Sequence, residues 1–213
     1  MKRIERQHGW SYVWGVFKSS PIDGISWEVD PSTMNQGCRP KIAPSTSIPS
    51  WSWASLDGPI SYGQVLPHGL SDSDPRQVDL DFLNLETELG LMILSGRILM
   101  LTMNAKFVDY RDSGRWEYDV VGVGRGLVRV DLPLRLGDKN VPLKAEDQPS
   151  GRYLPTVTRV PYGEEPPKEP WSGHCLCVLV SKTRLRVFGL LMGYSPRVPI
   201  ALERIGTWVG DSA

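Results

Sequence analysis

The stretch Ser50–Gly63 reads SWSWASLDGPISYG, and the hydrophobic period of the chain changes there from that of a helix to that of a strand. Trp51 and Trp53 are separated by one small residue, so an extended backbone points both rings to the same side. Asp57-Gly58-Pro59 then supplies a turn signal. We predict that strand pairing begins here, that both rings are largely buried, and that the serines form a face closely approached by another layer.

The residues before this stretch predict a short helical lead-in and a linker. One helical face is indicated by the i, i+3, i+4, i+7 spacing of Trp10, Val13, Trp14 and Phe17. Ser20-Pro21 is typical of the start of a second short helix. Residues 30–49 are rich in Pro, Ser, Thr and Gly, which favours a linker. The expected organisation is a helical lead-in at 1–29, a linker at 30–49 and a β-rich domain at 50–213.

The rest of the chain predicts short antiparallel strands. Alternating or short apolar runs bounded by turn residues occur at 78–82, 91–102, 128–134, 175–180, 184–191 and 201–208, with a break at Ser95-Gly96-Arg97. Residues 137–173 are dense in proline, which favours an extended, partly disordered loop with one strand at 156–160. The predicted fold class is mainly β, an antiparallel sandwich or barrel-like body with a short N-terminal helical lead-in.

Composition and charge exclude several classes of partner. The 213 residues carry 24 basic and 24 acidic side chains without long blocks of either sign, so a nucleic-acid surface is not expected. No apolar run approaches the roughly 20 residues that a membrane-spanning helix needs, so we expect no membrane partner. The 3 cysteines cannot all pair, and the N-terminus lacks a leader pattern. These features favour a cytoplasmic protein.

A candidate metal site is formed by His174, Cys175 and Cys177, with Cys38 as a potential fourth ligand of a tetrahedral zinc ion. In a strand, however, the two neighbouring cysteines share one face while the histidine points to the other. The surrounding apolar run favours small, buried cysteines in a core strand. We therefore expect no bound metal.

Catalytic motifs are also incomplete. Gly122, Gly124 and Gly126 resemble a dinucleotide-binding loop, but the next required glycine is replaced by Leu127. The histidines are scattered, no nucleophile elbow occurs, and the paired carboxylates lie among charged or turn residues. The sequence thus predicts a protein without catalytic residues or cofactors, which is not an enzyme.

One family resemblance is carried by the opening stretch. PSWSWASLDGPISY (49–62) closely resembles the recurrent segment that follows the domain for which fungal heterokaryon-incompatibility (HET) proteins are named. YVWGVFKSSPIDGISWEV (12–29) resembles the helical end of that region, and LGLMILSGRILML, HCLCVLV and ALERIGTW resemble its later strands. The family-motif residues are Pro49, Ser50, Trp51, Ser52, Trp53, Ala54, Ser55, Asp57, Gly58, Glu203, Arg204 and Gly206.

The resemblance implies the C-terminal region of such a protein without the HET domain itself. Ser11–Gly15 resembles the opening motif of that domain, but it lies far too close to the Trp-Ser-Trp segment, and the intervening family segments are missing. The implied function is a non-enzymatic accessory or interaction module in vegetative incompatibility and non-self recognition. The implied partners are another protein, the missing HET domain or a second copy of the chain.

Two further expectations follow. Without the HET domain, the lead-in should be less well packed than the β-rich body and leave an apolar patch. The residues alone also allow a different function, a small-molecule or glycan-binding β module that uses exposed Trp51, Trp53 or Trp116 as an aromatic platform.

Overall fold

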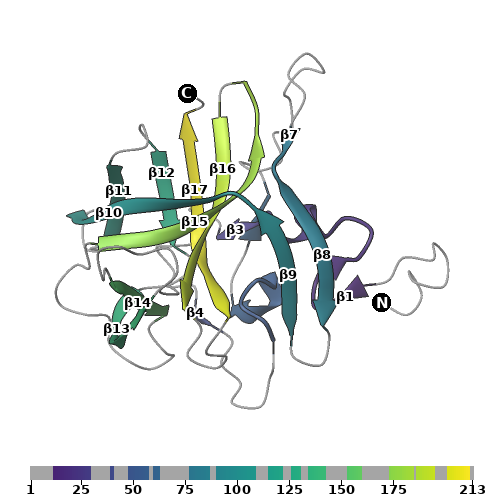
Figure 1. Ribbon diagram of the computed structural model, residues 1–213, viewed down its shortest axis with the longest axis horizontal. Coiled ribbons are helices and arrows are strands. Elements are labelled where there is room, and N and C mark those ends of the chain that lie inside the picture. The colour runs from purple at the N-terminus through teal and green to yellow at the C-terminus, as the bar shows by residue number, and fades with distance from the viewer. Residues whose placement is uncertain are drawn as a thin grey trace.

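The computed structural model describes residues 12–29, 39–40, 48–57, 60–62, 77–86, 90–108, 115–121, 126–130, 134–142, 153–159, 173–184, 186–194 and 201–211. Within these ranges the chain is mainly β, every strand pairing is antiparallel, and the helical content is a short α-helix and a 3-10 turn (Figure 1). The predicted fold class is confirmed. In the described part of the chain, no helix has the length and apolar character needed to cross a membrane.

The largest sheet curls over on itself. Its strand order is β10 (Ile98–Val108), β11 (Arg115–Val121), β12 (Gly126–Val130), β17 (Leu202–Asp211), β16 (Arg186–Tyr194), β15 (Gly173–Lys182) and β7 (Gln77–Val78). β10 also pairs with the first half of β15, which brings the two sides of the sheet together. The register of β11 and β12 joins them only at Asp119 and Leu127, and the described strands do not form a closed barrel. We call this element the curled sheet.

Two hairpin-like pairs flank the curled sheet. β8 (Leu80–Glu86) pairs with β9 (Leu91–Gly96), and the predicted break is confirmed because β10 starts directly afterwards at Ile98. β13 (Leu134–Pro142) pairs with β14 (Tyr153–Arg159), so the proline-rich region contains more strand than predicted. A register shift separates Leu136 from Asn140 in this pair. A short two-stranded sheet accommodates prolines because much of each strand is an edge.

The residues before β7 form a unit of very short elements: β1 (Tyr12–Val13), β2 (Val16–Phe17), α2 (Pro21–Ile25), β3 (Glu28–Val29), β4 (Arg39–Pro40), η2 (Trp53–Ser55), β5 (Leu56–Asp57) and β6 (Ile60–Ser61). Their strand pairs are β1–β2, β3–β6 and β4–β5, each a separate two-stranded sheet. We call the described residues between 12 and 62 the N-terminal unit. The predicted linker at 30–49 contributes β4 to it, and its remaining residues up to 47 lie outside the described ranges.

The predicted helix through Val13, Trp14 and Phe17 is wrong. Tyr12 instead pairs with Phe17 and Val13 with Val16, and the first pair stacks edge to face at 4.8 Å between ring centroids. Trp14 and Gly15 form the turn with φ angles of 45° and 89°, a left-handed backbone that cannot continue a right-handed helix. Trp10 lies outside the described residues. The second predicted helix is confirmed, since α2 follows Ser20 and begins at Pro21.

The predicted strand at Trp51–Trp53 is also wrong. Trp53–Ser55 is a 3-10 turn, and the N-cap residue Ser52 accepts a hydrogen bond from the Ala54 backbone N–H at 3.1 Å. Serine side chains compete for backbone groups in this way and favour caps over strands. Trp51 and Trp53 are half-buried, so the expectation that both are largely buried is not met.

The curled sheet separates two apolar cores. Its inside holds Leu101, Met103, Val128, Cys175, Cys177, Leu179, Leu191, Ile205 and Trp208. On its outside, a second core joins Leu80, Val180, Phe188 and Leu190 to Val16 and Ile25 of the N-terminal unit. β15 supplies both cores because successive side chains of a strand point to opposite faces.

The lead-in is well packed in its described part. Val16, Ile25, Trp27 and Val29 are all buried, and Trp27 and Val29 form a third core with Leu56. The expectation that the lead-in packs less well than the β-rich body is therefore contradicted for residues 12–29. The physical reason is that the outer face of the curled sheet supplies the apolar surface that this segment needs.

The packing of Trp208 against glycine yields a prediction. A Cβ added at Gly126 would overlap the Trp208 indole nitrogen, which is buried on β17 opposite β12. Overpacking of this kind costs about 1–3 kcal/mol. We expect Gly126→Ala to lower the free energy of unfolding by this amount in urea denaturation.

The control for this variant is the same substitution in a Trp208→Phe background. Phe lacks the overlapping indole nitrogen, so Gly126→Ala should cost less there than in the natural chain. Equal costs in both backgrounds would show that Trp208 does not set the requirement for glycine.

Candidate functional site

Two family-motif segments that are distant in sequence meet in the structure. The backbone N–H of Arg204, on β17, donates to the Ser50 Oγ at 3.0 Å. The Trp-Ser-Trp segment thereby lies against the Glu-Arg-Ile-Gly segment of the last strand. Both segments are recognisable in the sequence, but their contact is not, because they lie far apart in the chain.

The Arg204 side chain crosses from the curled sheet into the N-terminal unit. It is only 1% exposed, and its guanidinium donates to the backbone carbonyl of Ile25 at 2.7 Å and to that of Trp27. Its Cζ lies 3.4 Å from the centroid of the Trp27 ring. A planar, weakly hydrated guanidinium is suited to hydrogen bonding and stacking at one buried position. The carbonyl of Ile25, at the end of α2, also gains the partner that a helix terminus otherwise lacks.

The Trp-Ser-Trp segment binds the strained turn of the β1–β2 hairpin. The Ser52 Oγ donates to the carbonyl of Trp14, and the indole N–H of Trp53 donates to the carbonyl of Gly15 at 3.1 Å. The rings of Trp14 and Trp51 meet edge to face at 5.9 Å between centroids. A side chain at Gly15 would overlap the Trp53 indole. The turn is thus fixed by side chains from a segment over thirty residues away.

Two other indole N–H groups complete this arrangement. Trp27 donates to the carbonyl of Trp51 at 3.0 Å, and Trp51 donates to the carbonyl of Gly90 before β9, also at 3.0 Å. We call the whole set the Arg204 junction; its members are Trp14, Gly15, Ile25, Trp27, Ser50, Trp51, Ser52, Trp53 and Arg204. The indole N–H groups of Trp27, Trp51 and Trp53 bind the protein's own backbone, which weakens the view of Trp51 and Trp53 as a ligand platform.

The remaining motif residues have structural places near the junction. The carbonyl of Pro49 accepts from the Ser52 N–H at 3.0 Å, and Ser55 donates from its backbone to Ser52 at 3.0 Å. Ala54 lies within η2, and Asp57 pairs with Arg39 in β5–β4. In β17, Glu203 pairs with Gly193 and Gly206 with Leu191. Gly58 lies outside the described residues.

Sequence reasoning missed the main acceptors of this network. Trp14, Gly15 and Ile25 contribute backbone carbonyls, and no residue type or spacing identifies the partner of a carbonyl. Ser50 and Ser52 were expected to form a close-approach surface, and both hydroxyls are in addition hydrogen-bonded. The available signal was the serine beside each tryptophan, since buried serines need a partner.

A phenol lies at the edge of the junction. Burial raises the pKa of Tyr62 above its ordinary value of 10.0, nearby Tyr12 raises it further, and Arg204 acts in the opposite direction. The Tyr62 hydroxyl therefore stays protonated at neutral pH. It is not tuned to act as a general base, because such a group needs a pKa near the working pH.

The cysteines of the candidate metal site face the inner core. The Cys175 thiol donates to the carbonyls of Leu176 at 3.3 Å and Met192 at 3.5 Å, and burial raises its pKa to about 12. Burial also raises the pKa of Cys177, with a contribution from Cys175. Both thiols remain neutral, whereas metal ligands and nucleophiles are thiolates.

The described residues contain no group of three or more His, Cys, Asp and Glu side chains placed to hold a metal ion. Cys38 lies outside the described ranges. In the candidate dinucleotide-binding loop, Gly122 and Gly124 also lie outside the described ranges. The third glycine of that loop, Gly126, is the first residue of strand β12.

Fold and junction together define a mainly antiparallel β protein whose N-terminal unit is joined to the last strand by a buried arginine. No family model, curated protein or solved structure matches the chain. The HET resemblance therefore depends on the sequence strings, two of which meet at the Arg204 junction.

The hydrogen bonds of Ser52 give a prediction. Ser52→Ala removes the donor to Trp14 and the acceptor for Ala54 at a fully buried position. Leaving buried backbone groups unsatisfied costs about 1–3 kcal/mol, and we expect this loss in urea denaturation. Exposed Ser95, on β9, is the matched control and should lose less than about 0.5 kcal/mol on replacement by Ala. A loss of unfolding free energy in Ser52→Ala no larger than in Ser95→Ala would show that the hydrogen bonds of the Ser52 hydroxyl do not stabilise the fold.

The buried thiols predict a loss of stability at alkaline pH. In the unfolded chain they ionise near 9.0, whereas in the folded chain Cys175 ionises only near 12, so the unfolded state binds fewer protons between these values. The stabilisation is complete below pH 9.0 and is lost as the pH rises toward 12. We expect the free energy of unfolding of the natural chain to fall as the pH rises from 9.0 toward 12, and to fall less steeply in Cys175→Ala. Identical slopes in both chains would contradict the burial of this thiol.

Proposed function

We propose that this chain is a non-enzymatic protein-interaction module of the heterokaryon-incompatibility type, the cytoplasmic accessory region that accompanies a HET domain in fungal non-self recognition. The observation that carries the interaction role is an open apolar surface on β10. The resemblance of the motif segments to HET proteins carries the family.

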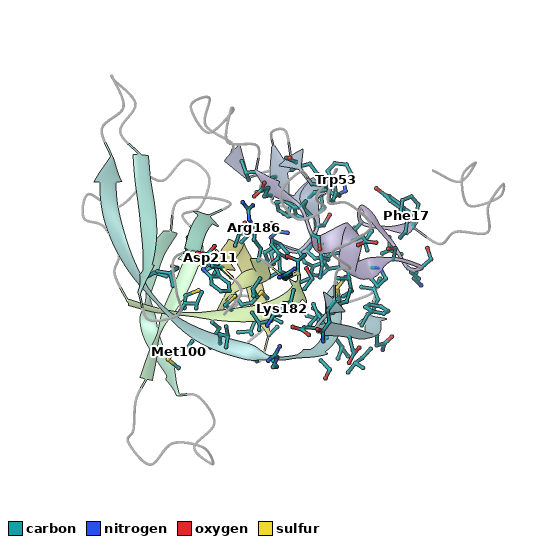
Figure 2. All side chains as sticks on the ribbon, turned by 90° about the horizontal axis from the view of Figure 1, so that it is seen from above. Phe17, Trp53, Met100, Lys182, Arg186 and Asp211 are labelled. Atoms are coloured by element: carbon teal, nitrogen blue, oxygen red, sulfur yellow. The ribbon has the colours of Figure 1, made fainter. Side chains whose placement is uncertain are left out.

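The open surface lies on the outer side of the curled sheet. Ile98 is 57% exposed and Met100 is 49% exposed. On the neighbouring strand β15, Ile98 pairs with Val178 and Met100 pairs with Leu176, and both partners are half-buried. Figure 2 shows Met100 on the outer side of β10, well away from Trp53 in the N-terminal unit. We call Ile98, Met100, Leu176 and Val178 the β10 face. Adjacent apolar side chains that remain exposed in this way are typical of protein-binding surfaces.

The junction supports the family part of the proposal. Ser50, Ser52 and Arg204 all belong to the motif segments that resemble HET proteins, and they bind one another or the same unit. The Arg204 junction uses residues from both the Trp-Ser-Trp segment and the Glu-Arg-Ile-Gly segment. This shared structural role gives a physical reason for one protein to contain both segments. The glycan-binding alternative has less support, because the indole N–H groups of Trp51 and Trp53 already bind backbone carbonyls.

A direct binding measurement tests the proposal. A purified HET domain, taken from a fungal protein that carries a Trp-Ser-Trp segment after its domain, is titrated with the purified chain by isothermal calorimetry. We expect binding that Ile98→Lys weakens at least about tenfold, since a charge at the centre of an apolar contact must be desolvated.

The matched control is Gln77→Lys, which adds the same charge at an exposed position on β7. It should leave the affinity unchanged. The proposal would be contradicted by a lack of binding to the HET domain. A loss of affinity that is equal for Ile98→Lys and Gln77→Lys would remove the role of the β10 face.

A further inference from the structure

The N-terminal unit is joined to the curled sheet by side chains, whereas its strand ladders are internal. β1–β2, β3–β6 and β4–β5 are separate two-stranded sheets formed within residues 12–61. Among the described residues, the strands of the curled sheet all come from residues 77–211. A unit whose backbone pairing is self-contained can open without breaking the ladders of the sheet below it.

Arg204 makes the polar connection between the two parts. Its backbone N–H donates to the Ser50 Oγ, and its guanidinium donates to the carbonyls of Ile25 and Trp27, all in the N-terminal unit. Its guanidinium also stacks on the Trp27 ring. The side chain thus holds the lead-in, whereas the backbone N–H of the same residue holds Ser50 of the Trp-Ser-Trp segment.

The turn that Ser52 and Trp53 hold is under backbone strain. Trp14 has a φ of 45°, in the left-handed region that bulky residues rarely adopt. Strained backbone persists only where its surroundings impose it, and such positions are concentrated in switch regions. The closed position of the β1–β2 hairpin thus depends on its contacts with the Trp-Ser-Trp segment.

The N-terminal unit covers the continuation of the β10 face. Ile98 pairs with Val178 on β15, and Val178 pairs with Leu190 on β16, so the three side chains form one row across three strands. The row is open at Ile98, half-buried at Val178 and buried at Leu190. Leu190 belongs to the outer core, to which Val16 and Ile25 of the N-terminal unit contribute together with Leu80 of β8.

We propose that the N-terminal unit is an autoinhibitory cover, which leaves the curled sheet as one body when the contacts of Arg204 open. Opening removes Val16 and Ile25 from the outer core that contains Leu190 and thereby enlarges the apolar surface available to a protein partner. This inference rests on the proposed function, because it concerns the regulation of the β10 face.

Hydrogen exchange of the full chain tests the cover. With increasing urea below the unfolding transition, amides of residues 12–29 and 48–57 should exchange together at lower urea than amides of β15, β16 and β17. This measurement uses the natural chain and needs no variant to fold. Simultaneous exchange of both parts would overturn the proposal, because the molecule would then be one cooperative unit.

A substitution tests the role of Arg204. Lysine keeps the charge but cannot reproduce the planar stacking and forked hydrogen bonds. Arg204→Lys should speed exchange in residues 12–29 at least about tenfold, leave the centre of β16 unchanged, and increase the binding of the apolar dye ANS. Arg186→Lys, at an exposed position on β16, is the control and should change neither. Faster exchange in β16 to the same extent would contradict a separate cover.

The binding assay separates this inference from the proposed function. If the cover is inhibitory, Arg204→Lys should bind the HET domain more tightly than the natural chain, and adding Ile98→Lys should remove the gain. Selective opening with unchanged HET-domain affinity would overturn the inhibitory role. Selective opening with no HET-domain binding in either chain would instead overturn the proposed function and leave the cover as a separately opening unit.

Discussion

The structure depends on one buried cation that holds two backbone segments. Removing a guanidinium from water is costly, and the cost is offset only where its donors find well-placed acceptors. Arg204 finds them in the carbonyls of Ile25 and Trp27, and the Trp27 ring covers its flat face. Because those carbonyls belong to the N-terminal unit, the burial of Arg204 is compensated only while that unit is docked on the curled sheet.

The two faces of the curled sheet differ in how completely they are buried. The inner face forms a core in which Trp208 lies against Gly126 and Gly210, and in which the thiols of Cys175 and Cys177 stay neutral. The outer face is completed by side chains from the N-terminal unit over part of its width and remains open at Ile98 and Met100. A surface that is apolar from Ile98 to Leu190 but only partly covered is suited to contact another protein.

In the proposed function the motif residues act indirectly. Ser52 and Trp53 fix the backbone of Trp14 and Gly15, and Arg204 fixes the lead-in, so these side chains are occupied within the fold. The surface proposed to bind a partner uses different residues, on β10. The motif segments thus hold the N-terminal unit on the curled sheet, and we propose that this position sets how much of the outer face a partner can reach.

The sequence by itself determined the fold class and the strands of the body. Period-two alternation and Gly or Pro turns predicted β15, β16 and β17, and Ser95-Gly96-Arg97 correctly separated β9 from β10. These features are local, because the side-chain period of a strand and the backbone freedom of glycine act within a few residues. Ser20-Pro21 predicted the start of α2 for the same reason.

Only the tertiary structure decided the shape of the lead-in and the composition of the site. Val13, Trp14 and Phe17 have helical spacing, yet Ser52 and Trp53 bind the carbonyls of a hairpin turn at Trp14 and Gly15. Ser50 binds the backbone of Arg204, which is 154 residues away in the chain. The acceptors in these contacts are mainly backbone carbonyls, which every residue carries, so no pattern in the sequence distinguishes the ones that are used. Which of them meet a donor is set by the packing of the N-terminal unit on the curled sheet.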